Sequence, residues 1–155
     1  MSRRKRKFKR EITADPKYNS TVIAKFINQV MRKGKKSTAE KVVYQAFDII
    51  EKRTKQEPTQ IFDEALKNVS PVLEVKSKRI GGANYQIPIE VRTQRKATLA
   101  MRWIIGTART GRGKPMSEKL ATELIAASKK EGEAMKKREN IQRMAEANRA
   151  FAHFA

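Results

Sequence analysis

Apolar residues recur every three to four positions along most of the chain, and this period predicts amphipathic helices. The first such stretch is Val22–Met31; it follows Ser20, a good helix cap, and is expected to end near Gly34. Ser37 and Glu40 form the pattern of a capping box, in which a hydroxyl and a carboxylate each bind a free amide at the start of a second helix. Four further helices are expected to begin at about Pro58, Thr93, Pro115 and Glu133.

Between the third and fourth expected helices the apolar period changes to two, which is the spacing of a β-strand. Apolar or small residues alternate with charged ones over residues 73–78, and the alternation resumes over residues 85–91 after the turn residues 81–84. The pattern predicts a β-hairpin at about 72–91. Its base is expected to pack on the helices, because an isolated ribbon is marginal in water. Its glycine-rich tip is expected to project free, and an ordinary hairpin that caps the core is the alternative.

The expected elements together predict a mainly α fold. We expect a single helical domain of about six helices over residues 13–155, with a protruding two-stranded β-hairpin and a disordered basic N-terminal arm over residues 1–12. The arm is expected because residues 2–10 carry seven cations and one apolar side chain, Phe8. Such a segment has little to bury, and its like charges repel.

The composition excludes several classes of chemistry. The chain has 155 residues with no Cys and one His, which excludes a thiol nucleophile, a thiolate zinc cluster and a multi-histidine metal site. No apolar run reaches the roughly 18 to 20 residues of a membrane-spanning helix. No apolar region follows the basic start, as it would in a signal peptide. We therefore expect a cytoplasmic protein with no membrane partner.

Charge points to the class of partner. Lys and Arg number 36 against 16 Asp and Glu, which gives a net charge of +20. Residues 1–10 carry +7 and residues 75–114 carry +9, whereas residues 37–74 carry −2, so one side of the fold is expected to be strongly positive. Solubility alone, the plainer alternative, needs only about 2 to 8 net charges on a small domain. A folded and very basic domain indicates a nucleic-acid partner.

Three arginines form a line on the fourth expected helix. Arg95, Arg102 and Arg109 are spaced by seven residues, so they lie on one side, opposite the apolar positions. Such a stripe is normally only the solvated face of a helix. Residues 91–117, however, contain no Asp or Glu that could neutralise the arginines from one turn away. A phosphate-binding face is therefore favoured, with Trp103 beside it at the rim of the core.

The sequence contains no complete catalytic motif of the kinds considered. The run 111–114, Gly-Arg-Gly-Lys, looks like a phosphate loop, but a Walker motif requires a glycine in place of Ala108 and a hydroxyl in place of Pro115. His153 has no acidic neighbour in the sequence to orient it for a catalytic triad. We therefore expect no enzymatic activity, no small-molecule substrate, no cofactor and no metal.

Several separate basic elements fit a folded RNA better than a uniform duplex. They include the arm, the loop after the first helix, the hairpin, the arginine line and the loop that follows it. Arginines in a line suit contacts to the phosphate backbone, which position a protein without reading sequence. A basic DNA-binding regulator or compacting protein is the alternative. The candidate RNA-binding residues are Arg3, Arg4, Lys5, Arg6, Lys7, Lys9, Arg10, Lys25, Arg32, Lys33, Lys35, Lys36, Lys76, Arg92, Arg95, Arg102, Arg109, Arg112 and Lys114.

Several motifs carry a resemblance to a known family. Among them are Asp15-Pro16-Lys17-Tyr18, Gly34-Lys35-Lys36-Ser37, Arg79-Ile80-Gly81-Gly82-Ala83-Asn84-Tyr85-Gln86-Ile87-Pro88 and Arg143-Met144-Ala145-Glu146-Ala147-Asn148-Arg149. In order and spacing, over nearly the whole chain, they resemble the family of the seventh protein of the small ribosomal subunit in its bacterial form.

The resemblance implies a structural constituent of the small ribosomal subunit. Such a protein would be a primary binder of the 3′ major domain of small-subunit (16S) ribosomal RNA and would nucleate assembly of the head. The resemblance also implies the ninth and eleventh small-subunit proteins as neighbours, and it puts the ribbon and C-terminus near the messenger exit path and the exit-site transfer RNA. The residues implied near messenger and transfer RNA are Lys78, Arg79, Gly81, Gly82, Ala83, Asn84, Tyr85, Arg143, Asn148 and Arg149.

Overall fold

The structure is a computed structural model in which residues 11–154 are described. It contains α1 (Thr21–Val30), α2 (Lys36–Thr54), α3 (Pro58–Val69), β1 (Leu73–Ile80), β2 (Ala83–Glu90), α4 (Thr93–Thr110), α5 (Met116–Ser128), α6 (Glu133–Ala147) and the 3₁₀ helix η1 (Arg149–Phe154). The two strands form one antiparallel sheet, so the expected mainly α fold with a hairpin is confirmed. The expected arm lies outside the described residues except for positions 11 and 12. No helix in the described part of the chain is long and apolar enough to cross a membrane.

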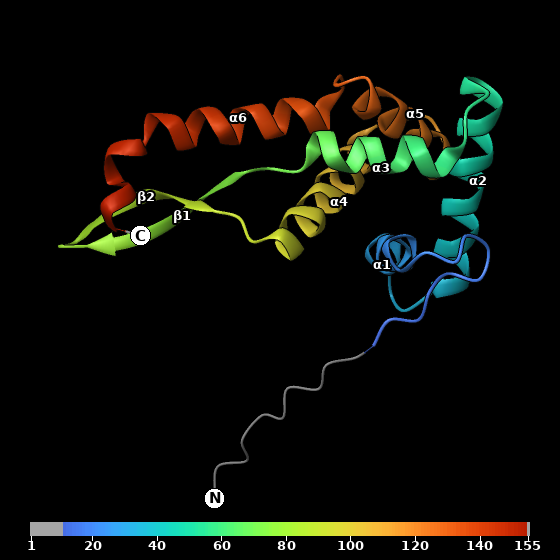
Figure 1. The fold of residues 1–155 in the computed structure, drawn as a ribbon, viewed down its shortest axis with the longest axis horizontal. Coiled ribbons are helices and arrows are strands. Elements are labelled where there is room, and N and C mark those ends of the chain that lie inside the picture. Colours follow the sequence, from blue (N-terminus) through green and yellow to red (C-terminus); the bar gives the residue numbers. More distant parts are fainter. Residues whose placement is uncertain (1–10, 155) are drawn as a thin grey trace, which may run out of the picture.

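The elements are arranged in two regions (Figure 1). Helices α1 to α5 pack into what we call the helical body. The hairpin leaves that body, α6 packs along β1, and η1 packs on β2. We call β1, β2, η1 and the C-terminal part of α6 the hairpin extension. Helix α4 connects the two regions, because it starts at the base of the hairpin and ends in the body.

Three phenylalanines hold the first three helices of the body together. Phe26 of α1 and Phe47 of α2 pack against Phe62 of α3, with ring centroids 5.0 and 5.6 Å apart, and all three are almost completely buried. The same core continues into α4 and α5 through Ile104 and Leu120. Ring pairs in tilted and edge-on arrangements stabilise a core beyond the burial of their surface. The body is therefore a firm support for the side chains on its surface.

The two expected helix caps have different outcomes. Ser20 caps α1 as predicted, since its hydroxyl accepts a hydrogen bond from the Ile23 amide at 3.4 Å. The capping box of the second helix is wrong: α2 begins at Lys36, so Ser37 lies inside the first turn and does not cap the helix. Residues 33 and 34 both adopt left-handed backbone conformations, and the turn that they form starts α2 before Ser37.

Asp15 fixes the segment before α1 to α2. Asp15 is 3% exposed. Its carboxylate accepts hydrogen bonds from the Lys17 and Tyr18 amides at 3.1 Å and from the Tyr44 hydroxyl at 2.6 Å. Burial and this hydrogen bond hold the pKa of Tyr44 well above its ordinary value. The chain that leads to the basic N-terminus therefore starts from a fixed point on the body.

The base of the hairpin is buried as expected, but its outer part is covered. Ile87 is 1% exposed and Val91 is 5% exposed. Farther out, η1 packs on β2, and the Tyr85 and Phe151 ring centroids are 5.2 Å apart. The turn at residues 81–84 is exposed, as expected for the tip, whereas η1 covers part of β2 behind it, a contact that the sequence did not predict. The physical reason is that the aromatic side chains after α6 bury their surface against the hairpin.

Candidate nucleic-acid interface

The arginine line on α4 begins with an ion pair at its hairpin end. Arg95 Nε donates to Glu74 Oε2 at 2.7 Å, and Glu74 Oε1 also lies 3.8 Å from Lys76 Nζ. Glu74 belongs to β1 and so lies outside residues 91–117, the stretch in which the sequence showed no acidic residue. The positive charges of Arg95 and Lys76 are therefore partly balanced within the protein.

At the other end of α4, Arg109 closes the C-terminus of α1. Its Nη2 donates to the backbone carbonyl oxygens of Val30 at 3.2 Å and Gln29 at 3.5 Å, groups that the end of a helix leaves unpaired. Burial, and the nearby positive charge of Arg32, hold the pKa of Arg109 below its ordinary value. A guanidinium has five N–H donors, so Arg109 can bind an anion while it supports the fold.

Arg102 lies between these two arginines. It is bound neither to a carboxylate, as Arg95 is, nor to backbone carbonyls, as Arg109 is, among the described residues. Its side chain is exposed, and within residues 11–154 it has no carboxylate partner. The neighbouring Trp103 is 7% exposed and belongs to the core, as expected for a residue at its rim. Of the three arginines in the line, Arg102 is thus the one whose charge is fully available to a ligand.

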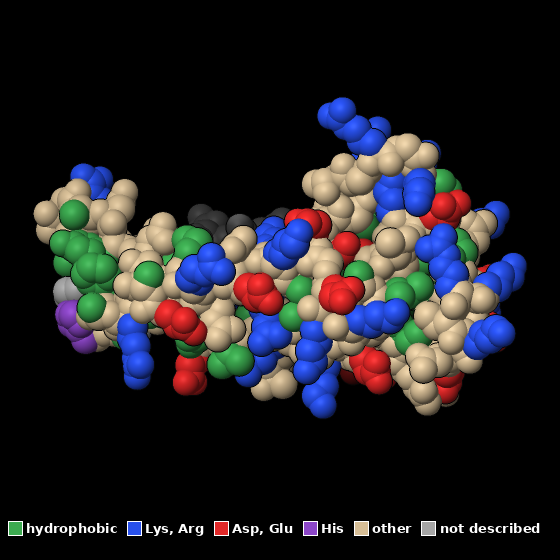
Figure 2. Space-filling model, turned by 90° about the horizontal axis from the view of Figure 1, so that it is seen from above, with side chains coloured by type: hydrophobic (Ala, Val, Ile, Leu, Met, Phe, Trp, Pro, Cys, Tyr) green, Lys and Arg blue, Asp and Glu red, His purple; other side chains and the backbone are tan. Residues whose placement is uncertain are grey.

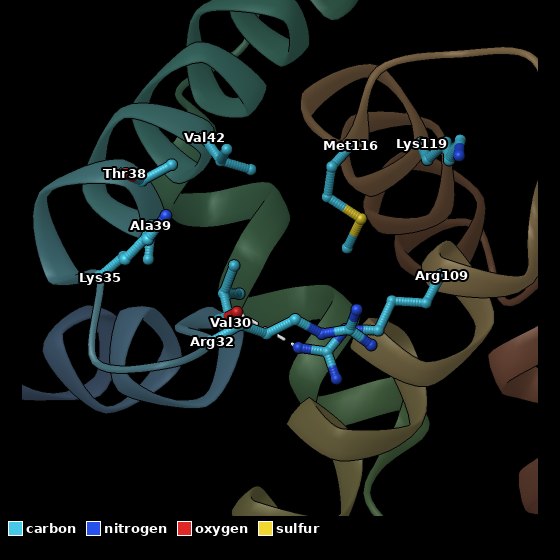
Figure 3. A pocket seen from close by; sticks show the side chains of 9 residues that line it. All are labelled: Val30, Arg32, Lys35, Thr38, Ala39, Val42, Arg109, Met116 and Lys119. Atoms are coloured by element: carbon cyan, nitrogen blue, oxygen red, sulfur yellow. Dashed lines mark hydrogen bonds between the residues drawn. The ribbon is translucent and has the colours of Figure 1, made fainter.

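A cleft opens where α1, α2, α4 and α5 meet, and we call it the junction cleft (Figure 3). Its volume is about 390 Å³. The side chains of Arg32 and Arg109 reach toward each other at one side, while Val42 and Met116 face the cleft from α2 and α5. Four of the lining residues are cations and none is acidic. The lining residues are Val30, Arg32, Lys35, Thr38, Ala39, Val42, Arg109, Met116 and Lys119.

Two loops that carry predicted cations join the helices of this junction. Residues 31–35 join α1 to α2, and residues 111–115 join α4 to α5. Lys119 of α5 completes the cleft and was not among the predicted binding residues, because its position on α5 gave no sign of the helices it would face. The predicted cations in these loops are Arg32, Lys33, Lys35, Arg112 and Lys114. The junction therefore combines positive charge with an apolar wall, a combination suited to binding an anion that carries an apolar part.

The remaining predicted cations are spread over both regions. Lys25 is exposed on α1, and Arg92 is the N-cap residue of α4 at the base of the hairpin. Lys36 begins α2 and lies 3.9 Å from the Glu40 carboxylate, which partly balances its charge. The cations at residues 3–10 lie outside the described part of the chain.

The surface around α6 differs from the junction cleft in the sign of its charges (Figure 2). Acidic side chains lie among the basic ones there, so no patch of a single sign forms. Lys136 and Glu133 of α6, for example, form an ion pair at 2.7 Å. Mixed charges of this kind keep a surface soluble without creating the field of one sign that attracts a polyanion.

The hairpin extension brings together the residues that the resemblance implies near messenger and transfer RNA. Residues 78–85 form the outer end of the hairpin, and Arg143, Asn148 and Arg149 lie in or just after the last turns of α6. The packing of α6 on β1 and of η1 on β2 joins these two segments, which are far apart in the sequence. They therefore form one end of the molecule.

The chain resembles known proteins over nearly its whole length. It matches the family described as Ribosomal protein S7p/S5e over residues 2–149. It is 54% identical to a protein from Methylobacterium radiotolerans over 99% of both chains, and 55% identical to one from Thermotoga petrophila over 98% of both. It is also 56% identical to a protein from Magnetococcus marinus over 99% of both chains. Each of these relatives is named small ribosomal subunit protein uS7.

Proposed function

Because the chain belongs to the ribosomal protein S7p/S5e family, we propose that it is a structural, non-catalytic component of the small ribosomal subunit in the cytoplasm and that it binds ribosomal RNA. The junction cleft is the observation that carries this proposal, since four cations from several elements line it and no acidic residue does. Such surfaces hold the phosphate backbone, and cations spread over irregular relief suit a folded RNA.

We assign the primary RNA contact to the helical body. Its proposed target is the 3′ major domain of small-subunit RNA, the domain that the sequence resemblance implies. A body built on one continuous core can hold that RNA without help from neighbouring proteins, as a protein that nucleates head assembly must. The N-terminal arm, residues 1–12, would extend the contact with its seven cations from the point where Asp15 fixes the chain to α2.

We assign a second contact to the hairpin extension. It stands away from the body, and its implied binding residues lie together at one end of the molecule. This arrangement supports a position near the messenger exit path and the exit-site transfer RNA, reached without loss of the primary contact. The ninth and eleventh small-subunit proteins are the proposed protein neighbours of the chain.

The test is retention of the purified full chain on fragments of small-subunit RNA, with duplex DNA as competitor at raised salt. We expect a fragment of the 3′ major domain to stay bound in excess DNA and a fragment from another domain to be released. The second fragment controls for nonspecific attraction, which depends on charge and falls steeply with salt. Equal displacement of both fragments by DNA would favour the alternative, a basic DNA-binding regulator or compacting protein.

A further inference from the structure

Gly106 lies in the interior of α4, and no contact or backbone conformation within residues 11–154 requires a glycine there. Glycine destabilises the interior of a helix relative to alanine. It is retained where the backbone needs a left-handed conformation or where another group comes too close for a Cβ. Neither applies within the fold, because Gly106 does not have a positive φ and a Cβ built on it would meet nothing within 4 Å. The remaining reason for a glycine is a close approach by a group outside the described residues, and we argue that this group is a bound ligand.

The surroundings of Gly106 indicate what that outside group is. A shallow groove of about 340 Å³ lies over it, lined by Gln29, Arg102, Ile105, Gly106 and Arg109. Arg102 precedes Gly106 by four residues and Arg109 follows it by three, so both lie on the same side of the helix as the glycine. The two arginines are about 10 Å apart along the axis, at 1.5 Å per residue. An anionic chain can thus lie across the bare backbone with a cation on either side.

We propose that this groove, the Gly106 notch, holds the sugar–phosphate backbone of one RNA strand against α4, with Arg102 and Arg109 bound to phosphates on either side of the glycine. The inference rests on the proposed function and adds to it the place where the strand comes closest to the body. Arg102 has no carboxylate partner in the described residues, and Arg109 keeps donors beyond those that bind the carbonyls of α1. No acidic side chain lines the notch to repel the strand.

An unpaired oxygen of Gln29 indicates that the ligand in the notch carries a hydroxyl group, as ribose does. Its Oε1 is a buried side-chain oxygen that has no hydrogen-bond partner among the described residues, while its Nε2 donates to Met101 Sδ at 3.6 Å. Buried polar atoms are rarely left without a partner. A phosphodiester has no proton to donate, whereas the 2′-hydroxyl of RNA does. A turn of the Gln29 amide toward a bound strand would give this oxygen the donor that it lacks.

The test is to restore the missing Cβ and to measure stability and RNA binding separately. Gly106→Ala is expected to raise the thermal unfolding midpoint by about 2 to 4 °C, because it removes the helix penalty of glycine. The same change is expected to weaken binding to the 3′ major domain fragment about threefold to tenfold, and Gly106→Leu to weaken it more, as one charge-assisted contact is strained or lost. Gln45→Leu, at an exposed position of α2, is the control for placing an apolar leucine on the surface of a helix.

A second measurement ties the effect to Arg102. Arg102→Gln is made in the natural chain and in the Gly106→Leu chain, and its effect on RNA affinity is expected to be smaller in the second, since the strand is already displaced. Equal losses in the two chains would show that Arg102 and Gly106 act independently and would overturn the inference.

Two further results would also overturn it. If both Gly106 variants bind as the natural chain does, RNA does not occupy the notch. The proposed function is then unaffected, because it is tested by whether the natural chain stays bound to the 3′ major domain fragment in excess DNA. If Gly106→Ala lowers the thermal midpoint together with RNA affinity, the glycine serves the fold. Loss of preference for ribosomal RNA over DNA in the natural chain itself would instead remove the proposed function.

Discussion

The two ends of α4 carry arginines at the same helical spacing but in different surroundings. At the hairpin end, Arg95 is bound to the Glu74 carboxylate at 2.7 Å. At the body end, Arg109 is bound to backbone carbonyls, and Arg102 has no carboxylate partner in the described residues. A carboxylate offsets part of the positive charge of the cations around it, whereas a neutral carbonyl leaves that charge in place. We therefore expect the charge of the residues that face an arginine, rather than its position on the helix, to decide whether it binds RNA.

The largest effect is expected when three positive charges near one end of α4 are removed and the loss of RNA affinity is compared with that for three near the other end. Changing Arg32, Arg102 and Arg109 to Gln is expected to weaken ribosomal RNA binding about a hundredfold or more, since contacts to charged groups are worth roughly 1.5 to 3 kcal/mol each. The matched control, Lys76, Arg92 and Arg95 changed to Gln, alters net charge equally and is expected to cost less than about tenfold. Filter binding at one salt concentration measures both, and equal losses would contradict the comparison.

Stability is expected to separate the two arginines at the body end. Arg109→Gln removes the donor that closes the C-terminus of α1, so the free energy of unfolding is expected to fall by about 1 kcal/mol. Arg102→Gln leaves a helix-compatible side chain in an exposed position, and its change is expected to stay within about 0.5 kcal/mol. Denaturant unfolding followed by circular dichroism measures both variants. If Arg102→Gln is the more destabilising of the two, Arg102 supports the fold and is not simply available to RNA.

The smallest effect is expected when the acidic partner at the hairpin end is neutralised. Glu74→Gln frees Arg95 and Lys76, so RNA affinity is expected to rise about twofold. Stability is expected to fall by about 1 kcal/mol, because the cations are half-exposed although the Glu74 side chain is only 13% exposed. The control is Glu133→Gln, which frees Lys136 on the mixed-charge face of α6. A rise of the same size in the control would show that the gain comes from net charge alone.

The sequence predicted the elements well because their apolar residues follow the period of a helix or a strand. The core of the body consists of such residues, including Phe26, Phe47 and Phe62, and their burial decides the helices that contain them. The hairpin was predicted for the same reason, from its period of two. Predictions that depended on a local motif were less certain: Ser20 caps α1, but the turn at residues 33–34 removed Ser37 from its expected place.

The parts of the site that the sequence did not reveal depend on contacts between distant residues. Glu74 and Arg95 are 21 positions apart, and Asp15 and Tyr44 are 29 apart, so no helical or strand period links them. Lys119 likewise reaches the junction cleft only because α5 packs beside α4. The contact of η1 with β2 has the same cause, since Phe151 meets Tyr85 from a segment far along the chain. Such pairs become visible only when the packing of the elements is known.

The salt dependence of RNA binding tests the central claim most directly, because its slope counts the phosphates that a protein neutralises. Affinity for the 3′ major domain fragment is measured over a range of salt for the natural chain, for Arg102→Gln and for Arg95→Gln. The slope is expected to fall by about 0.7 to 0.9 for Arg102→Gln and to stay unchanged for Arg95→Gln. A fall for Arg95→Gln with none for Arg102→Gln would contradict the assignment of the primary RNA contact to the body end of α4.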